Sequence, residues 1–301
     1  MARFLYQYEY IKLNGLLRDS MAGNTSLFLT LAVCWILFSY LFGSVNFALI
    51  LSKYVYHDDI RRHGSGNAGF TNMRRTFGTK AGVFTLLGDF GKTIVGVLGG
   101  MLLFGADVAT LAGLSCVLGH CFPIFYKFKG GKGVAAAGTM CLILDPVVFL
   151  ILIAMFILVV LSTKYLSLGS IMALILYPLI HNRVYNWLHA EVLPRYFIKN
   201  GLYTPVPTLD GVATEVPDLY LTLSHTASAV MIFVGVFFAL FVVIMHRGNI
   251  RRMMKGEENR FIIGKKAKEA ANEVKKTSDE AKKSRHRLDE LDEELNADEN
   301  S

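Results

Sequence analysis

Long apolar stretches alternate with short polar loops along this chain. Four stretches are expected as spans, namely Leu27–Ser52, Ala81–Phe104, Pro146–Leu161 and Thr226–Met245, and between them lie further apolar stretches at Val108–Phe125, Val134–Leu144 and Leu168–Ile180. The longest exceed the roughly 20 residues that a helix needs to cross a bilayer, whereas the shorter ones suggest tilted, kinked or re-entrant segments. The pattern predicts an all-α integral membrane protein, a polytopic bundle of about seven transmembrane helices.

The basic residues predict how this bundle is oriented. They gather between Lys53 and Lys80, between Lys127 and Lys132, at Lys164, and in the run after Met245. With seven spans, all these segments lie on one side of the membrane, which the positive-inside rule makes the cytoplasmic side. The N-terminus is then outside and the C-terminus cytoplasmic.

Three segments differ from the membrane domain that we expect at residues 27–260. Residues 1–26 form an N-terminal extension without the pattern of a cleavable signal peptide. Residues 182–224 form an insertion between spans, expected outside. Residues 261–301 are rich in Lys, Ala and Glu, which predicts a charged cytoplasmic tail that is helical or disordered, with a partner-binding helix as the alternative.

Composition narrows the function classes. The chain is 53% hydrophobic with a mean hydropathy of +0.41, too apolar for an ordinary soluble domain. Its net charge of +7 is explained by loops that face anionic lipid headgroups, so we expect a bilayer and no nucleic acid as the partner. The four cysteines lie in apolar stretches without the spacing of metal ligands, so we expect no metal site.

A first polar motif occupies the loop from Gly64 to Arg75. Its candidate phosphate ligands are Ser65, Asn67, Thr71, Asn72 and Arg75. An arginine offers a planar fork that matches phosphate, and hydroxyl and amide groups can complete the hydrogen bonds of the phosphate oxygens. The alternative is a simple turn whose arginines only set the topology.

A second motif is the run Lys129-Gly130-Gly131-Lys132-Gly133. It directly precedes an apolar stretch, so its glycines should lie at a helix N-terminus, where free N–H groups and the helix dipole favour an anion. The spacing differs from that of a Walker A loop, which argues against NTP hydrolysis. His120, upstream in an apolar stretch, either contributes to this region or pairs with a neighbouring backbone group.

A third motif follows the last span. It contains His246, Asn249 and, further on, Glu258. If the helix continues, His246 and Asn249 share one face, where an imidazole and an amide can orient a hydroxyl or a phosphate. The alternative is a basic cap that anchors the span among the headgroups.

Taken together, these motifs resemble, in their order and in their residues, the motifs of the bacterial acyl-phosphate:glycerol-3-phosphate acyltransferases, the PlsY family. The matching segments are Ser65–Arg75, Gly119–Pro123 with Phe128–Ala135, and His246–Arg252 with Glu258–Arg260. Asp89, Lys92 and the segment Ser167–Ser170 also fit. The resemblance covers roughly residues 27 to 261, apart from the insertion.

The resemblance implies an enzyme of the bacterial inner membrane whose active site faces the cytoplasm. It would transfer a fatty acyl group from acyl phosphate to the sn-1 hydroxyl of glycerol 3-phosphate, giving lysophosphatidic acid and phosphate, without a cofactor. An enzyme that makes acyl phosphate is a candidate partner. The implied catalytic residues are Ser65, Arg75, His246 and Asn249; the implied substrate-binding residues are Asn67, Thr71, Asn72, Lys129, Gly130, Gly131, Lys132, Gly133, Ser167 and Ser170; and Glu258 is expected to be structural.

Two questions stay open at this point. Acyl phosphate is an activated anhydride, so the reaction needs no protein nucleophile; a substrate phosphate oxygen can take the proton, and His246 as general base is the competing hypothesis. The rival class is a transporter of a phosphorylated metabolite, in which Asp89, Lys92 and Asp107 line a path. A scaffold that acts through the charged tail is a third reading.

Overall fold

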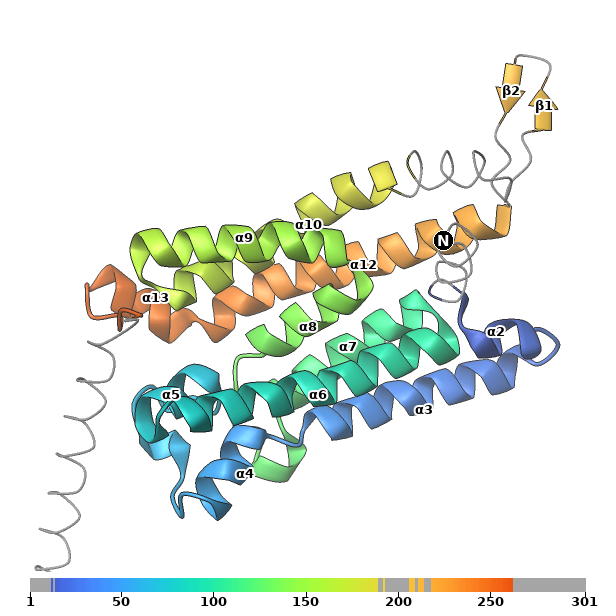
Figure 1. Cartoon of the computed structure of the whole chain (residues 1–301). Coiled ribbons are helices and arrows are strands. Elements are labelled where there is room, and N and C mark those ends of the chain that lie inside the picture. The colour runs from blue at the N-terminus through green and yellow to red at the C-terminus, as the bar shows by residue number, and fades with distance from the viewer. Residues whose placement is uncertain are drawn as a thin grey trace, which may run out of the picture.

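Two layers of apolar helices form the protein, as a computed structural model shows (Figure 1). The structure describes residues 12, 14–188, 192, 206–208, 211–213 and 218–261. One layer contains α3 (Thr25–Gly43), α6 (Thr79–Phe104) and α7 (Ala106–Cys121), and the other contains α9 (Pro146–Thr163), α10 (Leu166–Trp187) and α12 (Asp218–Met245). The short helix α8 (Val134–Leu144) packs against α6, α7 and α9 and joins the layers.

In the part of the chain that the structure describes, five helical stretches are long and apolar enough to cross a membrane: Thr25–Tyr54, Thr79–Phe104, Ala106–Tyr126, Pro146–Thr163 and Ser228–Met245. Their outward faces are apolar; on α9, for example, Leu150 is 64% and Leu158 is 67% exposed. Such faces suit contact with lipid tails, which confirms the predicted α-helical membrane bundle. Whether α8 and α10 also cross the membrane, and on which side the termini lie, stay predictions.

The first expected span is interrupted. The sequence predicts one apolar stretch from Leu27 to Ser52, but α3 ends at Gly43 and α4 (Phe47–Tyr54) begins after a turn. Asn46 starts the second helix, because its Oδ1 accepts a hydrogen bond from the N–H of Leu49 at 3.1 Å. A polar side chain that caps a helix inside an apolar run is a signal that a hydropathy profile does not register.

The expected insertion at residues 182–224 is partly helical. Helix α10 continues to Trp187, past the predicted end at Ile180, and contains Pro178, while α12 begins at Asp218. Between them the strands β1 (Val206–Thr208) and β2 (Gly211–Ala213) pair as an antiparallel hairpin, visible at one end of the bundle (Figure 1). Helices therefore cover both ends of the expected insertion, whose bounds stay a prediction.

The N-terminal extension also contributes a helix, α2 (Leu16–Ser20). The Arg18 guanidinium lies 2.7 Å from a carboxylate oxygen of Asp107 and donates a hydrogen bond of 3.1 Å to the carbonyl of Phe104. These contacts fasten α2 to the turn between α6 and α7. Residues 1–11 and the predicted charged tail beyond Phe261 lie outside the described residues.

Close packing of α3 against α7 relies on two glycines. A Cβ on Gly43 would collide with the backbone of Cys116, and a Cβ on Gly119 would collide with the carbonyl of Tyr40. The two helices therefore meet backbone to backbone near their ends, as small residues permit between membrane helices. This contact fixes the end of α7, from which the second motif emerges.

Candidate active site

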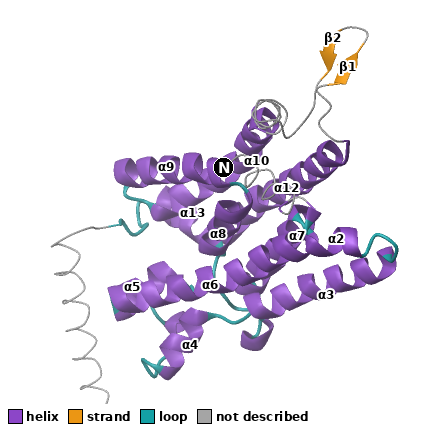
Figure 2. Cartoon of the chain, turned by 45° about the vertical axis from the view of Figure 1, so that its right-hand side comes forward, coloured by secondary structure: helices purple, strands orange, loops and turns teal. Residues whose placement is uncertain are grey.

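The three sequence motifs meet at one end of the bundle, opposite the β1–β2 hairpin (Figures 1 and 2). The first motif leads into α5 (Phe70–Phe77), the second leads into α8, and the third forms α13 (Arg247–Met254). The start of α10, which carries Ser167, lies at the same end.

A central network of hydrogen bonds joins residues that are far apart in the sequence. The Lys132 ammonium donates to Asn249 Oδ1, and Asn249 Nδ2 donates to Ser167 Oγ and to Glu258 Oε1, both at 2.6 Å. Ser167 Oγ in turn donates to Glu258 Oε1 at 2.8 Å, and Arg252 Nε donates to Glu258 Oε2 at 2.8 Å. We call Lys132, Ser167, Asn249, Arg252 and Glu258 the central network.

Glu258 is the acid at the centre of this network. Burial acts to raise the pKa of Glu258, but the hydrogen bonds from Asn249, Ser167 and Arg252 outweigh it and hold the pKa below its ordinary value. The carboxylate is therefore ionised, and its lone pairs are occupied by protein donors. This arrangement suits the structural role that the sequence predicts for Glu258.

Positive charge exceeds negative charge around Glu258. Burial, with help from the nearby Arg252 and Arg75, lowers the pKa of Lys132 to about 8 against the pull of Glu258. Burial also lowers the pKa of Arg75, which the repulsion of Arg252 reinforces. Among the described residues, Arg252 alone forms an ion pair with Glu258. The cations therefore leave a net positive charge that an anion can neutralise.

His246 is buried beside this group and is held in one orientation. Its Nδ1 lies 2.9 Å from the carbonyl oxygen of Val242, which can only accept, so the ring proton sits on Nδ1 and Nε2 is left as an acceptor. Burial, aided by the charge of Lys132, lowers the pKa of His246 to about 4. The imidazole is therefore neutral at pH 7 and is a weak base.

The third motif is not one continuous helix. Helix α12 ends at Met245, and His246 stands at the N-cap of α13 with φ −99° and ψ 7°. His246 and Asn249 are nevertheless both buried, and both neighbour Lys132. The turn at His246 directs Asn249 toward Lys132.

In the first motif, Asn72 organises the loop. Its Oδ1 accepts the N–H of Ser65 at 3.1 Å, and its Nδ2 donates to the carbonyls of Ile60 at 3.2 Å and His63 at 2.9 Å. Both amide hydrogens are thus used within the loop, so a direct substrate contact of Asn72 stays a prediction that would require these bonds to break. Ser65 and Thr71 are exposed and Asn67 is half-buried, and their substrate contacts stay predictions.

In the second motif, two of the expected free N–H groups are already bonded. The N–H of Gly130 donates to the carbonyl of Cys121 and that of Gly131 to the carbonyl of His120, each at 3.1 Å. Gly133 has φ +75° and leads into α8, whose N-terminus lacks a side-chain cap. The N–H groups at the start of α8, rather than those of Gly130 and Gly131, are therefore the ones placed to receive an anion.

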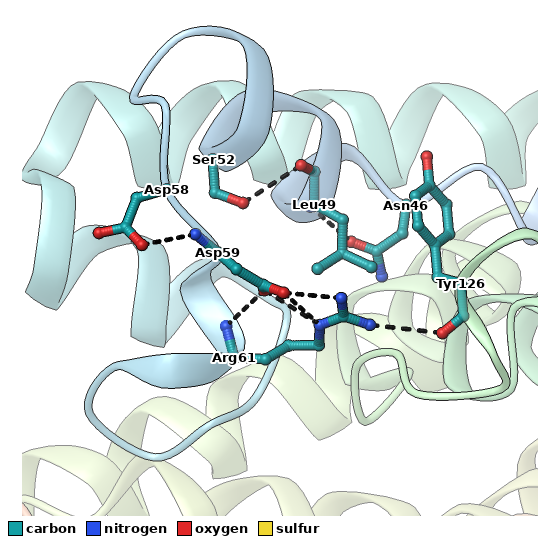
Figure 3. A network of polar contacts seen from close by, with 7 residues as sticks. All are labelled: Asn46, Leu49, Ser52, Asp58, Asp59, Arg61 and Tyr126. Atoms are coloured by element: carbon teal, nitrogen blue, oxygen red, sulfur yellow. Dashed lines mark hydrogen bonds and ion pairs between the residues drawn. The ribbon is translucent and has the colours of Figure 1, made fainter.

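A pocket of about 480 Å³ lies between the first two motifs. It is lined by Asp59, Arg61, Gly66, Lys127, Lys129 and Gly130. Figure 3 shows how its wall is built: Arg61 forms several hydrogen bonds with Asp59 and reaches the carbonyl of Tyr126 at 3.3 Å. The hydrogen bond from Arg61 lowers the pKa of Asp59, so this acid is neutralised by its partner. The exposed Lys127 and Lys129 remain as the cations of the pocket.

Some predicted residues lie apart from the central network, and one member was missed. Ser170 donates to the carbonyl of Leu166 inside its own helix at 2.9 Å. Asp89 and Lys92 lie within α6 and contact His120 instead. Arg252 was placed in the basic run and in the third motif but was given no role, although it follows Asn249 by three residues and so shares its helix face. No group of three His, Cys, Asp or Glu side chains suited to a metal occurs among the described residues.

Comparison with known proteins gives one consistent result. The family model described as glycerol-3-phosphate acyltransferase matches residues 33–256. The glycerol-3-phosphate acyltransferase of Chlorobium luteolum is 35% identical over 241 residues, which cover 76% of this chain and 96% of that protein. Glycerol-3-phosphate acyltransferase 2 of Bacillus anthracis is 33% identical over 227 residues, 75% of this chain and 97% of that protein.

Two solved structures are similar as well. Both are crystal structures of PlsY, an integral membrane glycerol 3-phosphate acyltransferase. The glycerol 3-phosphate form matches with a TM-score of 0.53 and 32% identity over 77% of this chain and 96% of that chain. The lysophosphatidic acid form matches with a TM-score of 0.55 and 30% identity over 76% of this chain and 94% of that chain.

Proposed function

We propose that this chain, which belongs to the glycerol-3-phosphate acyltransferase family, transfers a fatty acyl group from acyl phosphate to the sn-1 hydroxyl of glycerol 3-phosphate. The products are lysophosphatidic acid and inorganic phosphate. The reaction takes place at the motif end of the bundle, which we place on the cytoplasmic side of a bacterial inner membrane because the basic loops lie there.

The observation that carries this proposal is the surplus of cations around Glu258. Lys132, Arg75 and Arg252 face one carboxylate at the end of an apolar bundle. Both substrates contain a phosphate group, and the donor also carries an acyl chain that the apolar helices can accept. A site that binds two phosphates next to lipid needs several cations, and one ion-paired acid does not neutralise them.

The chemistry follows from the activated donor. The glycerol hydroxyl forms a C–O bond with the acyl carbonyl, and the bond from that carbonyl to the phosphate oxygen breaks. Cations fixed near the developing oxyanion and the leaving phosphate stabilise the transition state, and no protein nucleophile is required.

The hydroxyl proton goes to a phosphate oxygen in this scheme. The alternative acceptor is His246 Nε2, but an imidazole whose pKa is about 4 attracts a proton less strongly than a phosphate monoester, whose second pKa is near 6. His246 and Asn249 then serve mainly to orient Lys132 and the substrates.

Phosphate release tests the proposal directly. Purified protein in detergent is given acyl phosphate and glycerol 3-phosphate, and phosphate and lysophosphatidic acid are measured together. We expect equal amounts of both products, near loss of both in Arg75→Ala, and full activity after removal of residues 262–301. Transport of glycerol 3-phosphate into vesicles, without product formation in any active preparation, would instead establish the transporter.

A further inference from the structure

We propose that Asp89, Lys92 and His120 form a positioning cluster that holds the first motif against the second and thereby places Lys132 for the reaction. The inference concerns residues outside the central network, and it rests on the proposed function. Its parts come from the middle of α6 and the last turn of α7.

The positioning cluster is buried and tightly connected. Lys92 and Asp89 are each 2% exposed and His120 is 4% exposed. The Lys92 ammonium lies 3.0 Å from Asp89 Oδ1 and 3.0 Å from His120 Nδ1, while His120 Nδ1 lies 3.2 Å from Asp89 Oδ1. One cation and one anion lie in direct contact and the imidazole neighbours both, so the charges can balance inside the bundle.

One arm of the positioning cluster reaches the break between α3 and α4. The Lys92 ammonium donates to the carbonyls of Gly43 at 3.0 Å and Val45 at 2.9 Å. These carbonyls belong to the interrupted helix and need a donor, because apolar surroundings supply none. The break redirects the chain into α4, from which it continues into the loop of the first motif. Lys92 therefore fixes the point from which the first motif starts.

The other arm reaches the second motif. The carbonyl of His120 accepts the N–H of Gly131 at 3.1 Å, and a Cβ on Gly131 would collide with His120 Nε2. The same Cβ would lie 2.8 Å from the carbonyl oxygen of Ala68, which belongs to the first motif. Gly131 is thus the point where the two motifs touch, and the next residue is Lys132.

These contacts close a ring. It runs from Lys92 through the helix break and α4 to Ala68, across to Gly131, and back through His120 to Lys92. Ionisable side chains are expensive among apolar helices, and packing alone would be served by apolar residues. The ring of contacts passes through Gly131, the neighbour of Lys132. A role in placing Lys132 explains why charged residues occupy these positions in α6.

A matched pair of variants tests this proposal. His120→Leu removes the ring nitrogens of the positioning cluster, and His181→Leu removes an equally buried histidine, 0% exposed and paired with Asp145, in the other layer of the bundle. His120→Asn is the conservative rescue, since its amide can occupy the place of Nδ1. Each variant is measured by thermal unfolding, by the kcat and KM for both substrates, and by the rate at which an amine-reactive reagent labels Lys132.

We expect His120→Leu to lower kcat/KM by about 10²-fold per folded protein, the size of effect that small misplacements of a reacting group produce. His120→Asn should recover most of this loss. Labelling of Lys132 should become faster in His120→Leu, because the lysine leaves Asn249. His181→Leu should lower the unfolding temperature while leaving kcat/KM and the labelling rate within about twofold of the parent.

The proposal is overturned if His120→Leu keeps the parent's kcat/KM and labelling rate, or if His181→Leu changes both as strongly. If His120→Leu does not fold, the double variant Asp89→Asn with Lys92→Met, which leaves no unpaired charge, is measured in the same way. If the parent protein transfers no acyl group, the proposed function fails, and the labelling of Lys132 still decides whether the positioning cluster controls the loop.

Discussion

Two buried polar groups, one at each end of the helical bundle, balance their charges differently. Toward the hairpin end, His181 bonds to Asp145 through Nδ1 and lies 3.4 Å from Ser228 Oγ through Nε2. Its ring lies between Tyr177 and Tyr185, with centroids 5.5 Å and 4.9 Å away. Every polar atom of the imidazole has a protein partner, and the acid has a basic partner of its own.

The end of the bundle where the three motifs meet carries a surplus of positive charge. Lys132, Arg75 and Arg252 share one carboxylate, and His246 keeps Nε2 as an acceptor. A polar group whose hydrogen bonds and charges are all balanced within the protein holds helices together. A group that carries an unbalanced charge is suited to bind a ligand of opposite charge. Burial of polar residues alone therefore does not identify the site, whereas an unbalanced charge among buried residues does.

The largest effect should come from removing a surplus charge. We expect Lys132→Met to lower kcat/KM by about 10²- to 10³-fold, the usual result of removing one group that stabilises a transition state. The apparent KM for glycerol 3-phosphate should rise more than that for acyl phosphate. Steady-state kinetics with each substrate varied in turn measures this, with the exposed Arg62→Met as the control. An equal loss of kcat/KM in both variants would mean that the overall positive charge of the loops matters, and not the position of Lys132.

A change in the balanced group around His181 should affect stability instead of activity. Asp145→Asn leaves His181 with a neutral partner, and we expect a loss of about 2 kcal/mol in the free energy of unfolding, the value of a hydrogen bond to a charged group. Activity per folded molecule should stay unchanged. Thermal unfolding and kinetics on the same preparation check this, and a drop in kcat would show that the two ends are coupled.

The pH profile separates the two titrating groups of the site. Lys132 has its pKa lowered from 10.5 to about 8, so its charge is lost as the pH rises through 8, and kcat/KM should fall by about tenfold per pH unit above that value. In Lys132→Arg this alkaline decline should disappear. A decline that persists in the arginine variant would assign it to another group.

His246 should cause no break near pH 6.5. Its pKa is lowered to about 4, so the ring is already neutral at pH 6.5 and above. Its contribution to stability is fully present above 6.5 and is lost as the pH falls toward 4. A break between pH 6 and 7 that vanishes in His246→Gln would contradict this and would favour His246 as the general base.

The smallest effect should come from the N-terminal extension. Arg18→Ala removes an ion pair whose two side chains are about a quarter exposed, at 25% and 22%, so we expect a loss below about 1 kcal/mol. Acyl transfer should not change, because α2 is fastened to the turn between α6 and α7. Thermal unfolding measures the loss, and a large fall in activity would place the extension in the site.

The sequence predicted the helices and the meeting of the motifs better than the details of the contacts. Hydropathy located the apolar helices, and the positions of Lys132, His246 and Asn249 within motifs pointed to one site. The break after Gly43 has one local signal, the capping residue Asn46, which hydropathy does not register, and its carbonyls depend on a lysine from another helix, Lys92. The N–H groups of Gly130 and Gly131 were expected to be free, but the carbonyls that accept them come from the end of α7, a tertiary contact.

The last described residue of the chain has a consequence for anything that binds beyond it. The N–H of Phe261 donates to the carbonyl of Lys164 at 2.7 Å, and its ring lies under the guanidinium of Arg74, 4.5 Å away. The chain is therefore pinned beside the motif end before residues 262–301 begin. A protein captured by those residues would be tethered next to the site, which raises its effective local concentration there. Under the proposed function, an enzyme that makes acyl phosphate would gain most from such a tether, since its product would reach the site without diffusing far.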